Sequence, residues 1–373
     1  MTVKGKSSRL LVVLAMLWGM ANVSSAVADQ ACVSDAFLIS GLDVEAEAST
    51  GNLARQIATE SALEKAWQIL VNRLVIEGQD NTSLQTVDPS SMLLFTRVDS
   101  ETVLTSRYIA KLDYCFDRLM VRELFRENNI AYAELLSDRI MVLPVFVSGG
   151  RATLWQQPNP WKRAVENILP DHNGLVQLAI PSGFAIERSI TGQGIMDQRS
   201  SSLKKAVELD PAAMMLVSTA RVTLADNGIA LVVTGELYNR SGEKLADMED
   251  SYLPMASAEE LPKQLNLMAN EMVMKIEQVW RQANMVDLNA QNVIRITVGV
   301  ISLDQWFSLL TKLEGLSPIE QIDLRQLSAD AATLDMTLNG SREALDYALE
   351  QAGYRLDANP DAAVGGYLLL ADN

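Results

Sequence analysis

Residues 139–147 read Arg-Ile-Met-Val-Leu-Pro-Val-Phe-Val, a run that is almost continuously apolar and rich in β-branched side chains. A strand with one solvated face alternates apolar and polar residues, so an unbroken apolar run is typical of a strand that is covered on both faces. The run therefore predicts a central strand of a sheet with helices on both sides. It also marks the start of a new domain near Asp138.

The segments after this strand predict a mixed sheet flanked by helices. Asn159 is expected to cap a helix with Pro160 at its first position, where the missing N–H costs nothing. A strong hairpin signal, Asp226-Asn227-Gly228, joins two apolar segments. The predicted strands are 139–147, 176–180, 213–224 and 229–238, and the helices begin at 159, 200 and 259. The order β-α-β-α-β-β-α predicts an α/β domain over residues 138–285.

Two further domains are predicted on either side of this one. Residues 29–137 predict an N-terminal α+β domain, with strands at 33–43 and 105–115, an amphipathic helix at 53–74 and a short helix at 118–127. Residues 290–358 predict the order β-α-β-β-α-β, the split pattern of a ferredoxin-like sandwich. Residues 359–373 are predicted to be a tail whose segment 367–370 adds to a sheet edge. The expected fold class is multi-domain, α/β and α+β.

The first 28 residues predict a cleavable signal peptide. Lys4, Lys6 and Arg9 precede an apolar run over 10–23, and Ala26-Val27-Ala28 fits the pattern that signal peptidase accepts. The run has roughly 14 residues, fewer than the ~20 that span a bilayer, so we expect cleavage after Ala28 and a periplasmic protein. An uncleaved amino-terminal anchor is the alternative. A lipid anchor on Cys32 is disfavoured because residues 29–31 lack an apolar approach.

The charge of the chain excludes some classes of partner. The formal net charge is −16, and it becomes −19 once Lys4, Lys6 and Arg9 are removed with the signal peptide. Such an acidic surface repels phosphate backbones and anionic lipid headgroups. We therefore expect no nucleic-acid binding. No stretch after the signal peptide predicts an integral membrane span.

The chain has two cysteines, Cys32 and Cys115, and both lie in the part expected to be exported. Each flanks a strand-like run, 36–42 and 108–113, which can pair as antiparallel neighbours. An oxidising compartment permits a disulfide between them. The alternative is two unpaired thiols that pack as small hydrophobic groups.

Residues that could carry catalysis are scarce. His172 is the only histidine, so a multi-histidine metal site is excluded, and its turn-like surroundings predict a solvent-exposed loop residue. Gly149-Gly150 follows a buried type of strand, where ligands often bind, but a tight turn is the favoured interpretation. Acidic pairs such as Glu259-Glu260 are expected to be solvated surface. We predict no catalytic, metal-ligating or cofactor-binding residues and no cofactor.

The segment from Trp155 to Trp161 is the most distinctive of the chain. One interpretation is a helix start in which Asn159 and Pro160 begin the helix and one buried indole fixes it. The other is an exposed aromatic patch, Trp155, Asn159, Pro160 and Trp161, that binds a protein or glycan partner, since indoles are favoured anchors at interfaces.

Several short blocks, taken in order, resemble the DUF2066 family, a group of exported proteobacterial proteins without an assigned activity. The resemblance covers roughly residues 33–280. Its blocks are the first strand to Ala48, 54–74, Arg107-Tyr108 with Phe116-Asp117, 141–145, Asn159-Pro160-Trp161 and 217–220. This chain departs from the family at Ile180-Pro181-Ser182-Gly183, where Pro-x-Gly-Asp is expected. The resemblance implies no catalytic residue.

At the level of fold, residues 138–283 are also similar to the amino-terminal domain of TolB and to the curli-secretion channel family. Those domains assemble with partners in the cell envelope. A likeness of topology alone says little about function.

Three hypotheses for function follow. The first is an exported, non-catalytic cell-envelope protein that binds other envelope proteins through exposed sheet edges and the Trp155–Trp161 region. The second is a periplasmic small-ligand or glycan-binding protein with a pocket near residues 144–150. The third is a hydrolase with a carboxylate-only site, which requires two acidic side chains in one pocket within roughly 10 Å.

Overall fold

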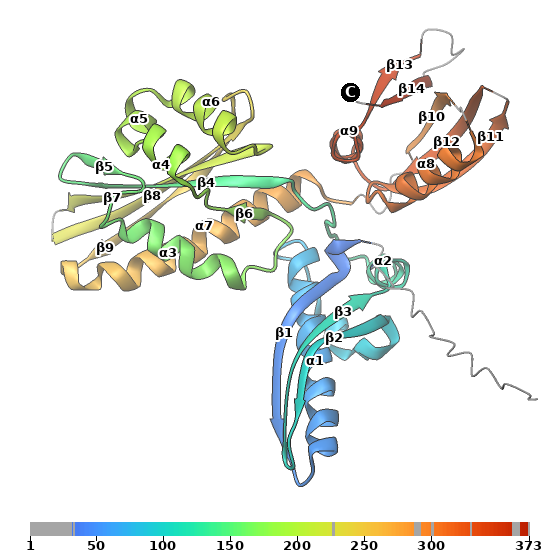
Figure 1. Ribbon diagram of the computed structural model, residues 1–373, viewed down its shortest axis with the longest axis horizontal. Helices are drawn as coiled ribbons and strands as arrows, with labels where there is room; N and C mark the ends of the chain where they lie inside the picture. The colour runs from blue at the N-terminus through green and yellow to red at the C-terminus, as the bar shows by residue number, and fades with distance from the viewer. Residues whose placement is uncertain are drawn as a thin grey trace, which may run out of the picture. The chain divides into compact units, whose positions relative to one another are not determined.

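The computed structural model describes residues 32, 34–225, 228–286, 292–299, 302–328, 330–359 and 366–371, which form three separate sheets with their own helices (Figure 1). The expected multi-domain α/β and α+β fold class is confirmed. The predicted signal peptide, residues 1–28, lies outside the described residues, as do Asp226 and Asn227 of the predicted hairpin turn. None of the helices in the described part of the chain combines the length and the apolar character that a bilayer crossing requires.

The first sheet has three antiparallel strands in the order β1-β3-β2. Its elements are β1 (Leu38–Glu47), α1 (Gly51–Leu74), β2 (Leu93–Val103), β3 (Arg107–Phe116) and α2 (Arg118–Glu127). The predicted helices and both predicted strands are present, but β2 was not predicted. Because nearly all of its residues are exposed, its sequence lacks the apolar alternation that marks a strand.

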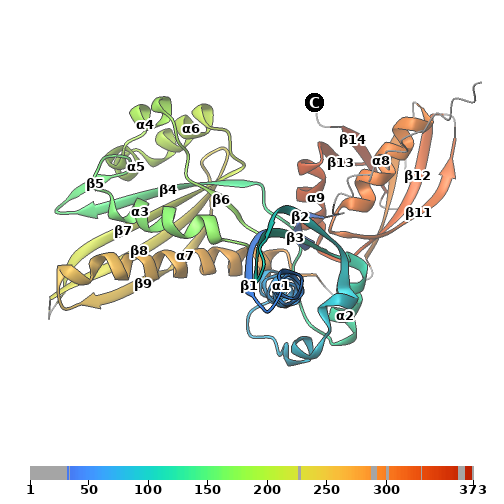
Figure 2. The ribbon, with the colours of Figure 1, turned by 60° about the horizontal axis from the view of Figure 1, so that its bottom comes forward.

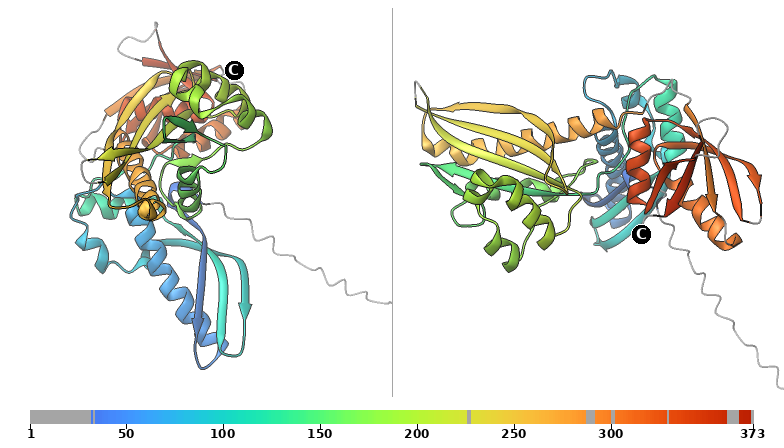
Figure 3. Two further views of the ribbon diagram at one scale, coloured as in Figure 1. Left: turned by 90° about the vertical axis from the view of Figure 1, so that its left-hand side faces the viewer. Right: turned by 90° about the horizontal axis from the view of Figure 1, so that it is seen from above.

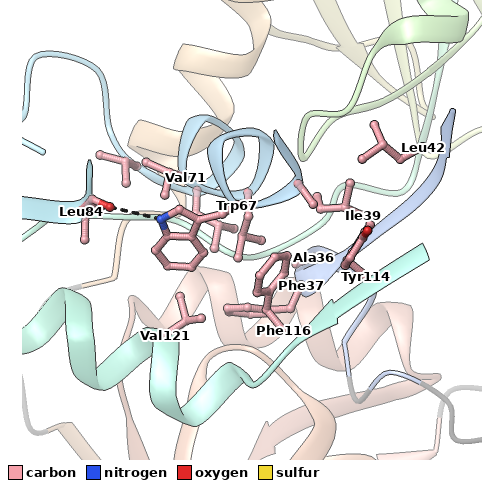
Figure 4. Packing of buried hydrophobic residues seen from close by; sticks show 14 of the residues in the cluster. Ala36, Phe37, Ile39, Leu42, Trp67, Val71, Leu84, Tyr114, Phe116 and Val121 are labelled. Carbon is pink, nitrogen blue, oxygen red and sulfur yellow. Dashed lines mark hydrogen bonds between the residues drawn. The ribbon is translucent and has the colours of Figure 1, made fainter. Parts of the chain in front are cut away.

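Small side chains bring α1 close to this sheet. Ala54, Ala58, Ala62 and Ala66 recur every four residues and are all buried. Farther along the helix, the ring of Trp67 lies 5.6 Å from that of Phe116. The Trp67 indole N–H donates to the carbonyl oxygen of Leu84 at 3.2 Å (Figure 4). The long loop after α1 is therefore fixed to the same core.

The predicted disulfide between Cys32 and Cys115 is present, and the alternative of two free thiols is wrong. Strands β1 and β3 are antiparallel neighbours, and Leu38 lies opposite Cys115 in their register. The two Cα atoms are 5.8 Å apart, which is an ordinary separation for a disulfide. Disulfides persist in oxidising compartments outside the cytoplasm, as expected for an exported chain.

The second sheet is mixed, with strands in the order β5-β4-β7-β8-β9 and β6 paired to β4. Its elements are β4 (Arg139–Ser148), β5 (Arg151–Thr153), α3 (Pro160–Ile168), β6 (Gln177–Ala179), α4 (Phe184–Ser189), α5 (Gly192–Asp197), α6 (Arg199–Leu209), β7 (Met214–Ala225), β8 (Gly228–Asn239), β9 (Lys244–Met255) and α7 (Leu261–Ala283). Strand β9 was not predicted, because its residues alternate irregularly between exposed and buried.

Strand β4 is covered on both faces, as its apolar run predicts. Ile140 and Val142 pack in the cluster with α3 and α7, whereas Met141 and Leu143 pack in the cluster with α4, α5 and α6. These two groups of helices lie on opposite faces of the sheet (Figure 3).

The third sheet has the strand order β11-β12-β10-β14-β13. Its elements are β10 (Asn292–Gly299), α8 (Leu303–Gly315), β11 (Ile319–Leu327), β12 (Ala331–Leu338), α9 (Arg342–Gln351), β13 (Tyr354–Ala358) and β14 (Gly366–Ala371). Helices α8 and α9 cover one face of it (Figure 2), and Ser302 and Ser341 cap their first turns.

The prediction that the segment 367–370 joins a sheet is confirmed, but its predicted position at the edge is wrong. Strand β14 is internal, since it runs parallel to β10 on one side and antiparallel to β13 on the other. The predicted β-α-β-β-α-β order is present up to β13, but β14 separates β13 from β10 and moves it to the edge. The apolar run of Tyr367–Leu370 is explained by this internal position.

Candidate functional site

The Trp155–Trp161 segment is part of the core and starts a helix. Asn159 is 2% exposed, and its side-chain oxygen accepts from the Lys162 N–H at 2.9 Å, which caps α3. Its amide nitrogen donates to the carbonyl oxygens of Pro144 at 3.0 Å and Leu154 at 2.8 Å. Pro160 occupies the first turn. The interpretation of this segment as a helix start is therefore correct.

The alternative of an exposed aromatic patch at this segment is wrong. Trp161 is fully buried, and its indole N–H donates to the hydroxyl of Ser218 at 3.2 Å. Trp155 is half-buried and donates to the carbonyl oxygen of Ile190 at 2.8 Å. All five described tryptophans are buried or half-buried, so no exposed indole among the described residues offers a platform for a glycan.

Gly149 and Gly150 form the turn between β4 and β5, with φ angles of 57° and 77°. Both values lie in the left-handed region that favours glycine, so the tight-turn interpretation is supported.

His172 departs from the sequence-based expectation. It was expected to be a solvent-exposed loop residue, but its side chain is only 15% exposed. Its Nε2 atom lies 3.0 Å from a carboxylate oxygen of Glu277 on α7 and 3.0 Å from the carbonyl oxygen of Val176. A single sequence could not show this contact, because the two residues are about a hundred positions apart.

Glu277 is a buried carboxylate whose two oxygens both accept hydrogen bonds. One oxygen accepts from the Val176 N–H at 2.8 Å, and the other accepts from the Leu175 N–H at 3.1 Å. Burial opposes ionisation, but the hydrogen bonds from His172 and from these two amides outweigh it and hold the pKa of Glu277 below its ordinary value. Glu277 therefore stays ionised and fixes the start of the segment after the 170–174 loop.

Gly174 makes this approach of Glu277 possible. A Cβ atom at position 174 would lie 1.9 Å from a carboxylate oxygen of Glu277 and 2.6 Å from a ring carbon of His172. Only glycine fits there without displacing the carboxylate.

Arg73 holds the other side of the same loop. It lies in the last turn of α1 and is 7% exposed. Its Nε donates to the carbonyl oxygen of Asn173 at 2.6 Å, and one terminal nitrogen donates to those of Ala36 at 3.0 Å and Leu38 at 2.8 Å. Burial lowers the pKa of Arg73 to about 10, against the opposing influence of Glu277 and Asp35. The charged side chain thus joins the first and second domains through backbone carbonyls.

A cleft of about 890 Å³ opens beside these residues. It is walled by β1 and α1, by the segment after α1, by the 170–174 loop and by α7. Apolar side chains such as Ile69, Val273 and Met274 lie among its lining, and Asp43, Glu77 and Asp171 are exposed on its rim. It is the candidate functional site, since concave sites of this size commonly bind ligands.

The connector (residues 131–138) joins all three domains near this site. Its backbone makes hydrogen bonds to α1 and the residues after it, to the segment before β6, to α7 and to α9. The contacts are Ala133 N–H to Leu74 O, Ile76 N–H to Ala131 O, Ser137 N–H to Leu175 O, Trp280 Nε1 to Leu135 O, Gln351 Nε2 to Leu136 O and Asp138 N–H to the Tyr347 hydroxyl.

A buried ion pair fixes the connector to α2. Arg122 is 5% exposed and Glu134 is 1% exposed, and the guanidinium donates to both carboxylate oxygens. Arg122 also donates to the carbonyl oxygen of Ser317 in the third domain at 2.9 Å.

Two further arginines of α2 reach the same domain, one turn to either side of Arg122. Arg118 donates to the Glu314 carbonyl oxygen at 2.8 Å, at the carboxyl end of α8, where a cation is favoured by the helix dipole. Arg126 pairs with Glu320 at 2.7 Å. The face of α2 that carries Arg118, Arg122 and Arg126 is therefore an internal docking surface.

The described residues contain no group of three or more histidine, cysteine, aspartate or glutamate side chains arranged to hold a metal ion.

Sequence reasoning missed Arg73, Glu277, Arg122 and Glu134. The one available signal was Glu277, an acidic residue beside the apolar stripe of a long helix, where a charge needs a partner.

No protein-family model matches the chain, and no curated protein matches it. The solved structures that are similar to parts of it include a hypothetical protein and a lipoprotein. The hypothetical protein CT253 from Chlamydia trachomatis is 13% identical, and the similar region covers 38% of this chain and 96% of that chain, with a TM-score of 0.26. The lipoprotein GNA1162 from Neisseria meningitidis is 14% identical, and the similar region covers 36% of this chain and 96% of that chain, with a TM-score of 0.24. At these identities and scores, neither structure indicates a family or a function for this chain.

Proposed function

We propose that this chain is an exported, non-catalytic protein of the bacterial cell envelope that acts by binding other proteins. The observation that carries the proposal is the use of the buried charges. Arg73, Glu277 and the Arg122–Glu134 pair make their hydrogen bonds to other parts of the chain, two of which, Arg73 to Asn173 and Arg122 to Ser317, run between domains. Groups bound in this way support a fixed surface and are not free for proton transfer.

The expected signal peptide and the Cys32–Cys115 disulfide support placement in the periplasm. The resemblance to the DUF2066 family supports the same placement and, like the residues, supplies no catalytic group. The proposed membership of that family rests on the blocks quoted above.

Two of the outer strands, β2 and β9, are poorly suited to pairing with a strand of another protein. The outer strand β2 has two register shifts and exposed charges at Arg97, Asp99 and Glu101. The outer strand β9 has register shifts against β8, several charges and Pro254. These features discourage the addition of another strand. The cleft beside α1 and α7 is therefore the proposed binding surface.

Cross-linking in intact cells tests this function. A photo-reactive residue at Gln79, which lines the cleft, is compared with one at Gln326, an exposed position on β11. We expect a defined protein adduct from position 79 that is absent from position 326. An absence of adducts from position 79, or the same adducts from both positions, would contradict the proposal.

A periplasmic small-ligand binder is the second candidate, and one observation favours it. The cleft volume of about 890 Å³ lies within the range of small-molecule sites. Thermal-shift screening with nucleotides, sugars and peptidoglycan fragments separates the two functions, because a ligand stabilises the form that it binds.

The carboxylate-only hydrolase has less support. Four acidic residues line the cleft, but the most buried of them, Glu277, has a pKa below its ordinary value. A general acid in a glycosidase needs a raised pKa, so Glu277 is unsuited to that role.

A further inference from the structure

We propose that the cleft binds an extended, lysine- or arginine-bearing segment of another protein, whose aliphatic side chains contact the cleft lining. This inference rests on the proposed protein-binding function and names the kind of partner for the same cleft.

The lining supplies apolar contact area. Met274 on α7 is 62% exposed and lines the cleft, although it follows the buried Val273. Half-buried Ile69 of α1 lines it from the first domain. An exposed methionine adapts readily to the shape of a bound aliphatic side chain. Apolar contacts of this kind give affinity to a segment that also carries charges.

The rim supplies the charge. Asp43, Glu77 and Asp171 are exposed on it, and none of the three forms an ion pair within the described residues. The cations of the cleft lining make contacts of their own, although the buried Nε of Arg281 has no hydrogen-bond partner. Arg73 and Arg281 donate to backbone carbonyl oxygens, and His172 contacts Glu277. Lys65 is the remaining exposed cation of the lining.

Charge complementarity indicates which kind of segment binds in the cleft. Hydrogen bonds to carbonyl oxygens leave Arg73 and Arg281 charged, so the lining holds four carboxylates, Asp43, Glu77, Asp171 and Glu277, against three cations, Lys65, Arg73 and Arg281. The buried Arg73 and Glu277 offset each other, and the three exposed carboxylates outnumber the two remaining cations, which favours a basic segment over an acidic one. A second copy of this chain is disfavoured because each copy has a formal net charge of −16 before processing. Phosphate-bearing ligands are disfavoured for the same reason.

The test uses the mature full chain and two labelled hexapeptides that differ only in charge, Lys-Leu-Lys-Val-Lys-Leu and Glu-Leu-Glu-Val-Glu-Leu. Fluorescence anisotropy measures the dissociation constant of each. The cleft variant Asp43→Asn/Glu77→Gln/Asp171→Asn is compared with Glu187→Gln/Glu249→Gln/Glu259→Gln, which removes three exposed carboxylates outside the cleft lining. Both variants change the net charge equally.

We expect the basic peptide to bind and the acidic peptide not to bind. The cleft variant should weaken binding by about tenfold or more, and the control variant by about twofold or less. Equal weakening in the two variants, or equal binding of the two peptides, would overturn the inference.

A second pair of variants tests the location independently of the rim carboxylates. Met274→Lys places a cation in the cleft, whereas Leu267→Lys places one two helical turns away on α7, at a side chain that is 54% exposed and outside the cleft lining. Only Met274→Lys should weaken binding of the basic peptide. Equal effects of the two substitutions would show that the peptide binds elsewhere.

The cell experiment separates the two proposals. If the adduct from Gln79 persists unchanged in the cleft variant, the protein-binding function stands and the basic-segment inference is wrong. If it disappears in the cleft variant but not in the control variant, both are supported.

Discussion

Arg73 and Arg122 are buried to nearly the same extent, at 7% and 5% exposure, but their charges are stabilised in different ways. Arg122 contacts the Glu134 carboxylate directly, whereas Arg73 is surrounded by backbone carbonyl oxygens. Burial lowers the pKa of both, yet Glu134 outweighs it for Arg122, whose pKa is raised, while the pKa of Arg73 falls to about 10. The charge of the same residue type can therefore be stabilised by an ion pair or by backbone dipoles.

This difference determines how much stability should be lost when a residue of each contact is replaced. Removal of one member of a buried ion pair leaves the other charge without compensation, which is strongly destabilising. Removal of Arg73 leaves carbonyl groups, some of which can be hydrated, together with the carboxylates of Glu277 and Asp35, which lose a favourable charge. Glu277, whose charge raises the pKa of Arg73 more than that of Asp35 does, keeps its own hydrogen bonds to Leu175 and Val176.

The largest effect is expected from Glu134→Gln. It should lower the free energy of unfolding by about 3–5 kcal/mol, because the Arg122 charge is left buried without a carboxylate. Urea denaturation followed by tryptophan fluorescence measures this. The double variant Arg122→Met/Glu134→Leu is the control and should recover most of the loss. A double variant as unstable as the single one would show that the pair itself is not the cause.

Removal of the disulfide should weaken mainly the hydrogen bonds that Arg73 makes to backbone carbonyl oxygens. The bridge closes a loop across 83 positions, so Cys32→Ser/Cys115→Ser should cost about 2–4 kcal/mol. It also anchors the chain just before Ala36 and Leu38, whose carbonyl oxygens bind Arg73. Hydrogen exchange should therefore rise at Phe37, whose N–H donates to the carbonyl oxygen of Ser34 beside the bridge, but not at Ala133 beside Glu134. An equal rise at both amides would contradict this separation.

Arg73→Met should have a smaller effect than Glu134→Gln. The loss of hydrogen bonds from a charged group to carbonyl oxygens should cost about 1.5–3 kcal/mol. The same denaturation experiment measures the difference. If Arg73→Met costs as much as Glu134→Gln, the distinction between an ion pair and a set of carbonyl groups is wrong.

Gly174→Ala should displace Glu277 without removing any charge. The added methyl group overlaps a carboxylate oxygen and should cost about 1–2 kcal/mol. Gly299→Ala is a matched control, since nothing lies within 4 Å of a Cβ atom there. Equal melting temperatures for the two variants would show that the 170–174 loop adapts freely.

The smallest effect is the pH dependence contributed by Glu277. Its folded-state pKa lies below the ordinary value of 4.5, so its contribution to stability is present above that pH and is lost as the pH falls through the folded value. The difference in unfolding free energy between the native chain and Glu277→Gln should therefore shrink below about pH 4.5.

The sequence predicted those parts of the fold that depend on local pattern. The apolar run of β4 and the Asn159-Pro160 helix start each act within a few residues, so their signals are readable. Strand β2 gave no such signal because its side chains are exposed. The internal position of β14 depends on pairing with β10, about seventy residues earlier in the chain.

The candidate site was harder to predict than the fold. Its contacts join residues such as Arg73 and Asn173, which are separated by 100 positions. Most of them also involve backbone carbonyl and N–H groups, which every residue carries, so no residue type marks them. The Trp155–Trp161 segment was conspicuous in composition, but its most distinctive residues serve the core.

Native-state hydrogen exchange tests most directly whether the connector (residues 131–138) unites the three domains. The amides of Ala133, Ser137 and Asp138 donate to the first, second and third domains respectively. In Glu134→Gln, all three should lose protection together, while amides within β7 and β8 keep theirs. Loss of protection at Ala133 alone, with Ser137 and Asp138 unchanged, would contradict the account.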